Sequence, residues 1–584
     1  MLLVADFETN TLSEKEEQLY RDGKLKAKDL KTNVWGWGMV EVGKVKDEDI
    51  LIGNSLDSFM KTVLSLANEN PKIYFHNLKF DGHFIISWLL NNGYKMVEDR
   101  KHATHNSFHT LISDNGLFYS INVVVKRYKS KRIQIQFLDS MKKLPFSVDR
   151  IAKAFHLDFE KVEVEESFYT KYRDEDHELT PLEIYYIQND IRVISQALQI
   201  LFHQGMEKMT IGSDALYNYK LSIGGEKYFR SIFPVLSHDE DDDIKYAYRG
   251  GVTMVKEEVR SKDIGVGKTY DINSMYPYIM RYKKLPYDKP IFYKGKYVEN
   301  EEYDLYIQQF KCEFKLKEGY LPTIQIKDRI GVYSPREYIR ESKGLTTLHL
   351  TNVDLDLFFD HYDVWNIEWD CGYMFKSSNE YFVNYIDHWT EVKENSTGAM
   401  RELAKLMLNS LYGKFGTKTI VQGKHPYLNE HGIVKMKLGE SERIDPIYSA
   451  VAVFTTSYGR DIILRTAQAN YDRFLYCDTD SIHVLGTETP EMVKLHPTKL
   501  GYWDDEGTFT RARFLGAKCY IEDFEESGLK VTCAGMTKEQ HKQVTYDNFH
   551  FGLVVKGKLQ PKIVKGGVVL VNTDYEVKVR GFIR

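Results

Sequence analysis

The segment from Tyr476 to Ser481 reads Tyr-Cys-Asp-Thr-Asp-Ser and places the carboxylates of Asp478 and Asp480 two positions apart. Apolar and aromatic residues precede it, and an alternating stretch from Ile482 to Leu485 follows, so the pattern predicts a β-hairpin with acids at its tip. Two carboxylates this close repel each other unless cations lie between them and a partner. The hairpin therefore indicates a magnesium site that also holds substrate phosphates, with a solvated acidic turn as the alternative.

A second acidic position lies upstream, in the segment from Tyr270 to Pro277. The residues from Val266 onward predict a strand, which the proline prevents from continuing. The carboxylate of Asp271 at the strand end would join the hairpin acids on two ions. The carbonyl oxygen of Ile272 could supply another ligand, and Tyr276 could form the floor under an incoming sugar. An ordinary strand-to-helix turn is the alternative.

Residues 401–415 are rich in helix formers, with Thr397 as a candidate N-cap and Gly413 as a candidate C-terminal stop. Four polar side chains, spaced by four, four and three residues, fall on one face of this helix: Arg401, Lys405, Asn409 and Tyr412. Such a face suits a triphosphate and a base pair. The alternative is a solvated amphipathic face.

The N-terminal third carries a separate set of acids. Strands are predicted at residues 2–7 and 72–75, and a helix at residues 181–201. Four carboxylates lie on or just after these elements: Asp6, Glu8, Asp81 and Asp190. Such a set can hold two metal ions, activate a water and stabilise the leaving oxygen of a phosphodiester. Tyr186 precedes the last of these acids by one helical turn.

The three segments around Asp271, Asn409 and Asp480 match, in order, the signatures DxxSLYP, KxxxNSxYG and YxDTDS of family B DNA polymerases. Over nearly its whole length the chain resembles the protein-primed polymerases of small linear-genome bacteriophages, the phi-twenty-nine type. The resemblance implies an α/β (α+β) multidomain fold, with a ribonuclease-H-like DEDD exonuclease domain followed by a right-hand palm, fingers and thumb with two insertions. It also implies two Mg²⁺ ions per active site, with Mn²⁺ as a possible substitute.

The resemblance divides the chain into consecutive regions: an exonuclease domain at 1–210, the palm at 211–282 and 450–532, a first insertion at 283–381, fingers at 382–415, a second insertion at 416–449 and a thumb at 533–584. It implies that the first insertion, through Asp354, binds a terminal (priming) protein. The second insertion, a predicted hairpin at 421–437, would help enclose DNA and give processivity and strand displacement. Template-primer DNA and deoxynucleoside triphosphates are the implied substrates.

Within the exonuclease region the motifs DFET, NxxxFD and YxxxD resemble a 3′–5′ proofreading exonuclease in which Tyr186 orients the attacking water. Lys161 matches a phosphate contact, and Glu163 is a weaker metal candidate. Further positions match residues that hold a frayed primer strand: Tyr74, His76, Asn77, Phe80, Ser140, Met141 and Phe146.

In the polymerase region the resemblance implies further contacts. Residues expected to bind template-primer lie in or near the motifs YxGG, TxxGR and KxY: Tyr248, Arg249, Gly250, Gly251, Ser274, Thr456, Arg460, Lys518 and Tyr520. Those expected to bind the nucleotide are Tyr276, Lys393, Arg401, Lys405, Asn409 and Tyr412. Three positions depart from the closest pattern, namely Met275, Thr397 and Arg401.

Composition sets the remaining bounds. The net charge of −5 gives no global basic signature, so any DNA-binding channel must be local. We expect the acidic run 238–243 and the extra segment 11–33 to form solvated polar loops. Five cysteines without a CxxC pair favour a reducing compartment, and the absence of a signal peptide or membrane span favours the host cytoplasm.

The sequence disfavours three alternative functions. A nucleic-acid-primed family B polymerase is disfavoured by the two insertions. A non-catalytic DNA-binding scaffold is disfavoured because all seven candidate carboxylates are present, and an exonuclease alone would leave the cationic helix without a role. We expect a monomer, or a heterodimer with the priming protein.

Overall fold

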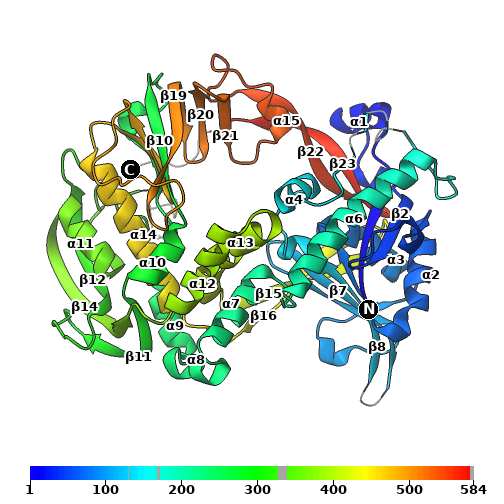
Figure 1. Ribbon diagram of the computed structural model, residues 1–584, viewed down its shortest axis with the longest axis horizontal. Helices are drawn as coiled ribbons and strands as arrows, with labels where there is room; N and C mark the ends of the chain where they lie inside the picture. Colours follow the sequence, from blue (N-terminus) through cyan, green and yellow to red (C-terminus); the bar gives the residue numbers. More distant parts are fainter. Residues whose placement is uncertain (129–130, 163, 166–167, 169–170, 327–337, 579–584) are drawn as a thin grey trace.

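The computed structural model describes residues 1–128, 131–162, 164–165, 168, 171–326 and 338–578. Figure 1 shows a mixed α/β multidomain fold, which confirms the predicted fold class. Two large sheets lie at opposite sides of the molecule, and helical and hairpin elements connect them (Figure 1).

The first large sheet has eight strands in the order β3-β2-β1-β4-β8-β7-β6-β5. These strands are β1 (Leu2–Thr9), β2 (Val34–Glu41), β3 (Leu51–Gly53), β4 (Lys72–Phe75), β5 (Lys95–Met96), β6 (Ser107–Ile112), β7 (Phe118–Arg127) and β8 (Arg132–Asp139). The helices of this region are α1 (Glu14–Arg21), α2 (Leu56–Ser65), α3 (Leu78–Asn91), α4 (Val148–Phe155) and α6 (Pro181–His203).

Two glycines of β2 let helix α6 lie close to the sheet. Gly38 pairs with Asp6 of β1, and a side chain there would collide with Ile187 of α6. Gly36 pairs with Glu8 and is similarly close to Ile187. The missing side chains thus bring the helix that carries Asp190 over the strand that carries the first two acids.

The second large sheet has seven strands in the order β21-β20-β19-β10-β18-β17-β9. Its members are β9 (Thr253–Val255), β10 (Gly267–Ile272), β17 (Phe474–Asp478), β18 (Ser481–Leu485), β19 (Trp503–Gly516), β20 (Cys519–Phe524) and β21 (Gly528–Cys533). Helices α10 (Met275–Tyr282) and α14 (Ser449–Ala469) pack against this sheet. Helices α7 (Ile211–Ser222), α8 (Glu226–Ile232) and α9 (His238–Tyr246) precede its first strand in the sequence. The predicted acidic hairpin is formed by β17 and β18.

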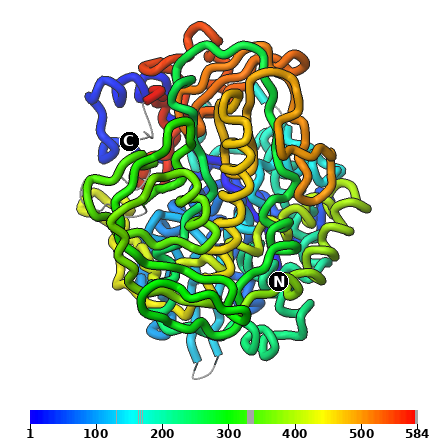
Figure 2. Tube along the Cα trace, turned by 90° about the vertical axis from the view of Figure 1, so that its left-hand side faces the viewer, coloured from blue at the N-terminus to red at the C-terminus, as the bar shows by residue number. Residues whose placement is uncertain are grey.

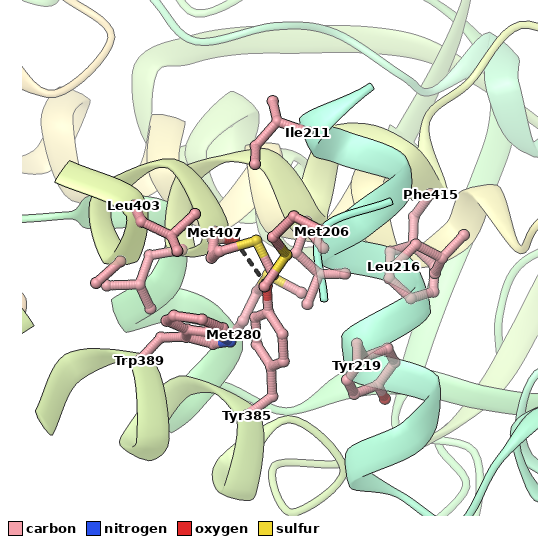
Figure 3. Packing of buried hydrophobic residues seen from close by; sticks show 14 of the residues in the cluster. Met206, Ile211, Leu216, Tyr219, Met280, Tyr385, Trp389, Leu403, Met407 and Phe415 are labelled. Carbon is pink, nitrogen blue, oxygen red and sulfur yellow. Dashed lines mark hydrogen bonds between the residues drawn. The ribbon is translucent and has the colours of Figure 1, made fainter. Parts of the chain in front are cut away.

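Helices α12 (Val383–Asn395) and α13 (Gly398–Phe415) pack against α7 around one apolar core. Figure 3 shows Tyr385 inside this core, where its hydroxyl donates to the carbonyl oxygen of Met407 at 2.9 Å. Leu403 and Phe415 of α13 are buried beside it, so the apolar face of α13 fixes the direction of its polar face. The helix passes through Gly413 and ends at Phe415, two residues beyond the predicted stop.

The remaining strands form three smaller sheets. A four-stranded sheet in the order β11-β14-β12-β13 contains β11 (Leu285–Lys294), β12 (Leu305–Leu316), β13 (Thr346–Thr351) and β14 (Tyr362–Ser378), with helix α11 (Asn352–His361) packed beside it. One hairpin is formed by β15 (Ile420–Leu428) and β16 (Val434–Arg443), as predicted. Another follows helix α15 (Lys538–His541) and consists of β22 (Val554–Val564) and β23 (Gly567–Glu576).

Two predicted loops are wrong. The acidic run belongs to helix α9, whose capping box joins Ser237 and Glu240, and Asp241 is fully buried beside Lys245 and Thr419. Segment 11–33 contains helix α1 and buries Leu12 and Leu30. In both cases the polar composition concealed apolar or charged partners that lie far away in the sequence.

No helix within the described ranges is long and apolar enough to cross a membrane.

Candidate active sites

The first candidate site lies where β10 meets the β17–β18 turn. Asp271 pairs with Ser481 across the sheet, and the backbone N–H of Ile272 donates to the carbonyl oxygen of Asp480 at 2.8 Å. The turn is tight because Thr479 adopts a positive φ of 62°. Sheet register thus brings together the two predicted acidic segments.

Gly251 supports this turn from behind. A side chain at Gly251 would collide with Thr479, whose backbone N–H donates to the carbonyl oxygen of Val252 at 2.7 Å. Gly251 therefore has a structural reason, since it lets the backbone before β9 lie against the acidic turn.

Burial and mutual repulsion perturb the acids of this site. Burial raises the pKa of Asp271 to about 8, and the charges of Asp480, Glu506 and Asp504 add to the rise. Burial also raises the pKa of Asp480 to about 6, with a further increase from Asp478 and an opposing effect of Lys518. Carboxylates that resist ionisation in this way are typical of functional sites.

Asp478 has a different environment from its neighbours. The Lys518 ammonium donates to both of its carboxylate oxygens, at 2.6 and 2.8 Å, and the Thr253 hydroxyl donates at 3.0 Å. The KxY motif predicted that Lys518 contacts the primer, but it did not predict this ion pair. Asp478 is thus the member of the set that already has a cation.

A group of cations faces the acids from the helices. The Lys393 ammonium is buried and donates to the Ser274 hydroxyl at 3.2 Å, and burial lowers its pKa, with added repulsion from Arg401 and Lys405. The ammonium of Lys405 lies 2.6 Å from a carboxylate oxygen of Glu402. Three cations held close together form a surface that favours a polyanion.

Two tyrosine rings lie between the acids and α13. The ring centroids of Tyr276 and Tyr412 are 4.2 Å apart, and both side chains are only partly buried. Asn409 is exposed on the same helix face. The predicted nucleotide-binding residues of α10, α12 and α13 are thus brought to one place.

The second candidate site lies between β1, α3 and α6. Burial raises the pKa of Asp6 to about 7, and repulsion from Asp190 adds to the rise. The pKa of Glu8 lies well above its ordinary value because of burial and then because of repulsion from the other three acids. Burial and Asp6 likewise raise the pKa of Asp81. The four predicted acids therefore lie close enough to repel one another, with Asp81 and Asp190 buried and Asp6 and Glu8 half-buried.

Asp190 and Tyr186 lie on the same face of α6, as predicted, and both are buried. The Lys161 ammonium lies 4.0 Å from one carboxylate oxygen of Asp190. The other oxygen is buried and has no hydrogen-bond partner within the described part of the chain. Glu163, the weaker metal candidate, lies outside the described residues.

The donor sets fit divalent cations chemically. No group of three or more His, Cys, Asp or Glu side chains among the described residues lies in a formed metal-binding arrangement. Nevertheless, both sites hold carboxylates whose ionisation is suppressed by burial and then by like charges, and a cation would relieve that repulsion. The buried oxygen of Asp190 without a partner agrees with this fit.

The residues expected to hold a primer strand differ in how exposed their side chains are. The His76 ring bonds to the Ser140 hydroxyl at 2.9 Å and to the Phe146 carbonyl at 2.7 Å. The backbone N–H groups of Asn77 and Met141 donate to Asp139. Phe80 and Phe146 are partly buried, whereas Tyr74 is only 5% exposed and packs against Phe202. Their contacts with DNA stay predictions.

Several expected DNA contacts around the first site are buried. Thr456 donates to a carbonyl of its own helix, and Tyr520 packs against Tyr476. Arg460 is 5% exposed and donates through one nitrogen to the carbonyl oxygens of Arg249 and Gly250. Tyr248 is partly buried. These side chains hold the framework in the protein described here, and their DNA contacts stay predictions.

Asp354, the expected partner contact, is also buried. It accepts from Arg460 at 2.6 and 2.9 Å and from the Ser457 hydroxyl at 2.8 Å. The Arg249 guanidinium donates nearby to the carbonyl oxygen of Gln325. The carboxylate of Asp354 is therefore not exposed for a partner protein, and its role in binding one stays a prediction.

Comparison with known proteins agrees with this geometry. The family described as DNA polymerase type B, organellar and viral, matches residues 63–173 and 163–496. The DNA polymerase of Bacillus phage phi29 is 45% identical over 566 residues, covering 93% of this chain and 96% of that protein. The DNA polymerase of Streptococcus phage Cp-1 is 34% identical over 578 residues, covering 94% and 97%.

A solved structure of phi29 DNA polymerase with primer-template DNA and incoming nucleotide substrates matches with a TM-score of 0.90 and 43% identity. The match covers 99% of this chain and 100% of that one. The chain therefore belongs to the type B DNA polymerase family of organelles and viruses. Within that family it groups with the phage DNA polymerases of the phi29 type, which confirms the resemblance drawn from the three signatures.

Proposed function

We propose that this DNA polymerase is a protein-primed, processive and strand-displacing replicase of a linear phage genome, with a 3′–5′ proofreading exonuclease. The observation that carries the proposal is the presence of two separate sets of partly or fully buried, mutually repelling carboxylates, one at each of the two large sheets. One set faces a cationic helix face suited to a triphosphate, whereas the other lies beside a tyrosine suited to orienting water.

At the first site, Asp271 and Asp480 would hold two Mg²⁺ ions, with Asp478 and the Ile272 carbonyl as further ligands. Bound there, the ions would supply charge neutralisation for the primer hydroxyl and the pyrophosphate. The chain's own cations, Lys393, Arg401 and Lys405, would bind the triphosphate as it enters. Tyr276 would support the sugar and exclude a 2′-hydroxyl.

At the second site the four acids would hold a second pair of ions, and Tyr186 would orient the water that attacks the terminal phosphodiester. Lys161 would bind the phosphate, because its ammonium is partly exposed beside Asp190. A frayed primer end would reach this site from the first one. Mn²⁺ could replace Mg²⁺ at both.

The relatives guide the choice of partners. The related phi29 enzyme is known in complex with primer-template DNA and with incoming nucleotides, and we assign the same substrates to this chain. A terminal protein would bind at the four-stranded sheet of the first insertion, and the complex would be a heterodimer in the host cytoplasm. The regional boundaries given above are part of this proposal.

The test separates the two activities in one assay. A labelled primer on a single-stranded circular template, with Mg²⁺ and all four deoxynucleotides, should give products many times longer than the circle. Asp480→Ala should abolish extension and retain degradation of single strands. Asp6→Ala combined with Asp81→Ala should do the reverse. Extension by Asp480→Ala would overturn the first site, and metal-dependent degradation by the double variant would overturn the second.

A further inference from the structure

Residues 11–33 lie against the β22–β23 hairpin, although more than five hundred residues of sequence separate them. In Figure 1 the hairpin runs from the region of β21 and α15 to the first large sheet, where α1 lies beside it, and Figure 2 shows the two ends of the colour scale meeting there. A two-stranded hairpin has little stability by itself in water. Its conformation therefore depends on what it packs against.

The contact has an apolar centre. Leu12 and Leu30 are buried together with Val564, Val569 and Val571 of the hairpin, and Tyr20 and Leu25 pack around them. All five central side chains are less than a tenth exposed. Burial of this kind gives a contact that persists rather than one that forms occasionally.

Directional bonds fix the position of the hairpin on this surface. A Glu17 carboxylate oxygen of α1 accepts from the backbone N–H of Asn572 at 2.7 Å. Lys31 and Lys565 form a parallel β-bridge, next to which the backbone N–H of Thr32 donates to the Lys565 carbonyl at 3.1 Å. Gly566, with a φ of 92°, lies so close to the Thr32 carbonyl that a side chain would collide with it.

Two other regions meet at the same turn. Gly567 lies against the ring of Phe84 of α3, so the hairpin end reaches the core of the first large sheet. Ile433, between β15 and β16, forms an antiparallel bridge with Lys565. The hairpin turn is thus held by the first sheet, by segment 11–33 and by the second insertion at once.

We propose that residues 11–33 are a docking surface for the β22–β23 hairpin, and that this docking determines how long the polymerase stays on its primer-template. The elements follow one another from the first large sheet through the second large sheet to the β22–β23 hairpin and back to the first large sheet (Figure 1). Docking closes this path, and DNA lying inside it could leave only by sliding off an end or by opening the contact. The second part of the inference rests on the proposed processive function.

The test uses a reversible covalent lock. Lys31→Cys with Lys565→Cys places two thiols on residues paired across a β-bridge, within the range that a disulfide spans. Oxidation without DNA should link them in most molecules, whereas Lys31→Cys alone should give no such link. On primed circular DNA in the presence of competitor primer-template, the oxidised form should dissociate more slowly than the same protein after reduction, by a factor of roughly five or more.

A second pair of variants needs no cysteine. Glu17→Ala removes the acceptor for Asn572 and should speed dissociation several-fold. Glu14→Ala makes the same change of charge on the same helix, at a side chain with no hydrogen bond or ion pair within the described chain, and should match the parent. Single-nucleotide incorporation should be unchanged in both.

Absence of the crosslink, or equal dissociation of oxidised and reduced protein, would overturn the inference. A parent enzyme that stops after a few nucleotides would instead contradict the proposed processive function. Primer extension alone tests the processive function, whereas the yield of the crosslink tests the docking of the hairpin.

Discussion

The guanidinium of Arg460 and the carboxylate of Asp354 form a bidentate ion pair, with nitrogen–oxygen distances of 2.6 and 2.9 Å, inside the protein. Asp354 belongs to α11 and Arg460 to α14, so the pair joins the helix beside the four-stranded sheet to the long helix beside the second large sheet. The same arginine donates to the carbonyl oxygens of Arg249 and Gly250, next to Gly251, which packs against the acidic turn. A change around α11 can therefore reach the first candidate site through one side chain.

We expect Asp354→Ala to lower the free energy of unfolding by about 3–5 kcal/mol, because it leaves Arg460 as a buried charge without its partner. Burial favours the neutral carboxyl, but the Arg460 charge and hydrogen bonds lower the pKa of Asp354 overall. The measurement is a urea unfolding curve. Asp360→Ala is the matched control, because that aspartate pairs with Arg465 at the surface and should contribute about 1 kcal/mol or less. Equal losses would show that the buried pair has no special weight.

Asp271→Asn should stabilise the metal-free protein while abolishing extension. The folded protein keeps a proton on Asp271 up to about pH 8, whereas the unfolded chain releases it near the ordinary pKa of 3.8. The free energy of unfolding of the metal-free protein therefore falls as the pH rises from about 4 to 8. At pH 8 we expect the variant to exceed the parent by at least about 1 kcal/mol.

This difference should vanish below about pH 4, where the parent carboxyl is protonated in both states. Thermal unfolding in the presence of a chelator measures it at both pH values. Asp472→Asn, at an exposed aspartate, controls for the change of net charge. A parent that is more stable than Asp271→Asn at pH 8 without metal would contradict the burial-raised pKa.

Asp478→Asn should reduce extension less than Asp480→Asn does. Asp478 is already bonded to Lys518 and Thr253, so a metal ion would gain less there than at Asp480, whose pKa is raised by burial and then by the charge of Asp478. We expect the rate constants of single-nucleotide incorporation to differ by about tenfold or more, which corresponds to about 1.4 kcal/mol in the barrier. The reverse order would show that Lys518 leaves Asp478 on substrate binding.

Tyr276→Val should admit ribonucleotides, whereas Tyr276→Phe should exclude them as the parent does. The ring packs 4.2 Å from that of Tyr412, which fixes it under the expected position of the sugar. Removing the ring opens space for a 2′-hydroxyl without removing a catalytic group. The ratio of kcat/KM for a deoxynucleotide and its ribonucleotide measures the change. Similar ratios for parent and Tyr276→Val would remove Tyr276 from this role.

That the acids of the first candidate site lie close together could be predicted because the signals are local. Asp478 and Asp480 lie on one turn, and strand pairing alone brings Asp271 to them. The exposure of the expected DNA contacts could not be predicted in the same way. Arg460 and Thr456 lie in a motif of suitable composition, yet whether a side chain faces DNA or the interior depends on α11, about a hundred residues away.

The two loops wrongly predicted from their polarity have the same explanation. Asp241 is buried with one carboxylate oxygen held by Thr419 and Lys245, and the first of these partners comes from a distant segment. In segment 11–33 only a few apolar residues are present, and their partners lie on the hairpin. The local composition shows that a segment can be solvated, but it does not show whether a distant segment of the chain packs over it.

The contact between segment 11–33 and the hairpin joins parts of the chain that are synthesised far apart in time. A chain leaves the ribosome N-terminal part first, so Leu12 and Leu30 are available long before Val569 and Val571 have been translated. During that interval their apolar surface has no cover. A nascent chain stalled before β23 would therefore present a patch that chaperones and proteases recognise, and the final stretch of translation both hides this patch and joins the outer parts of the molecule.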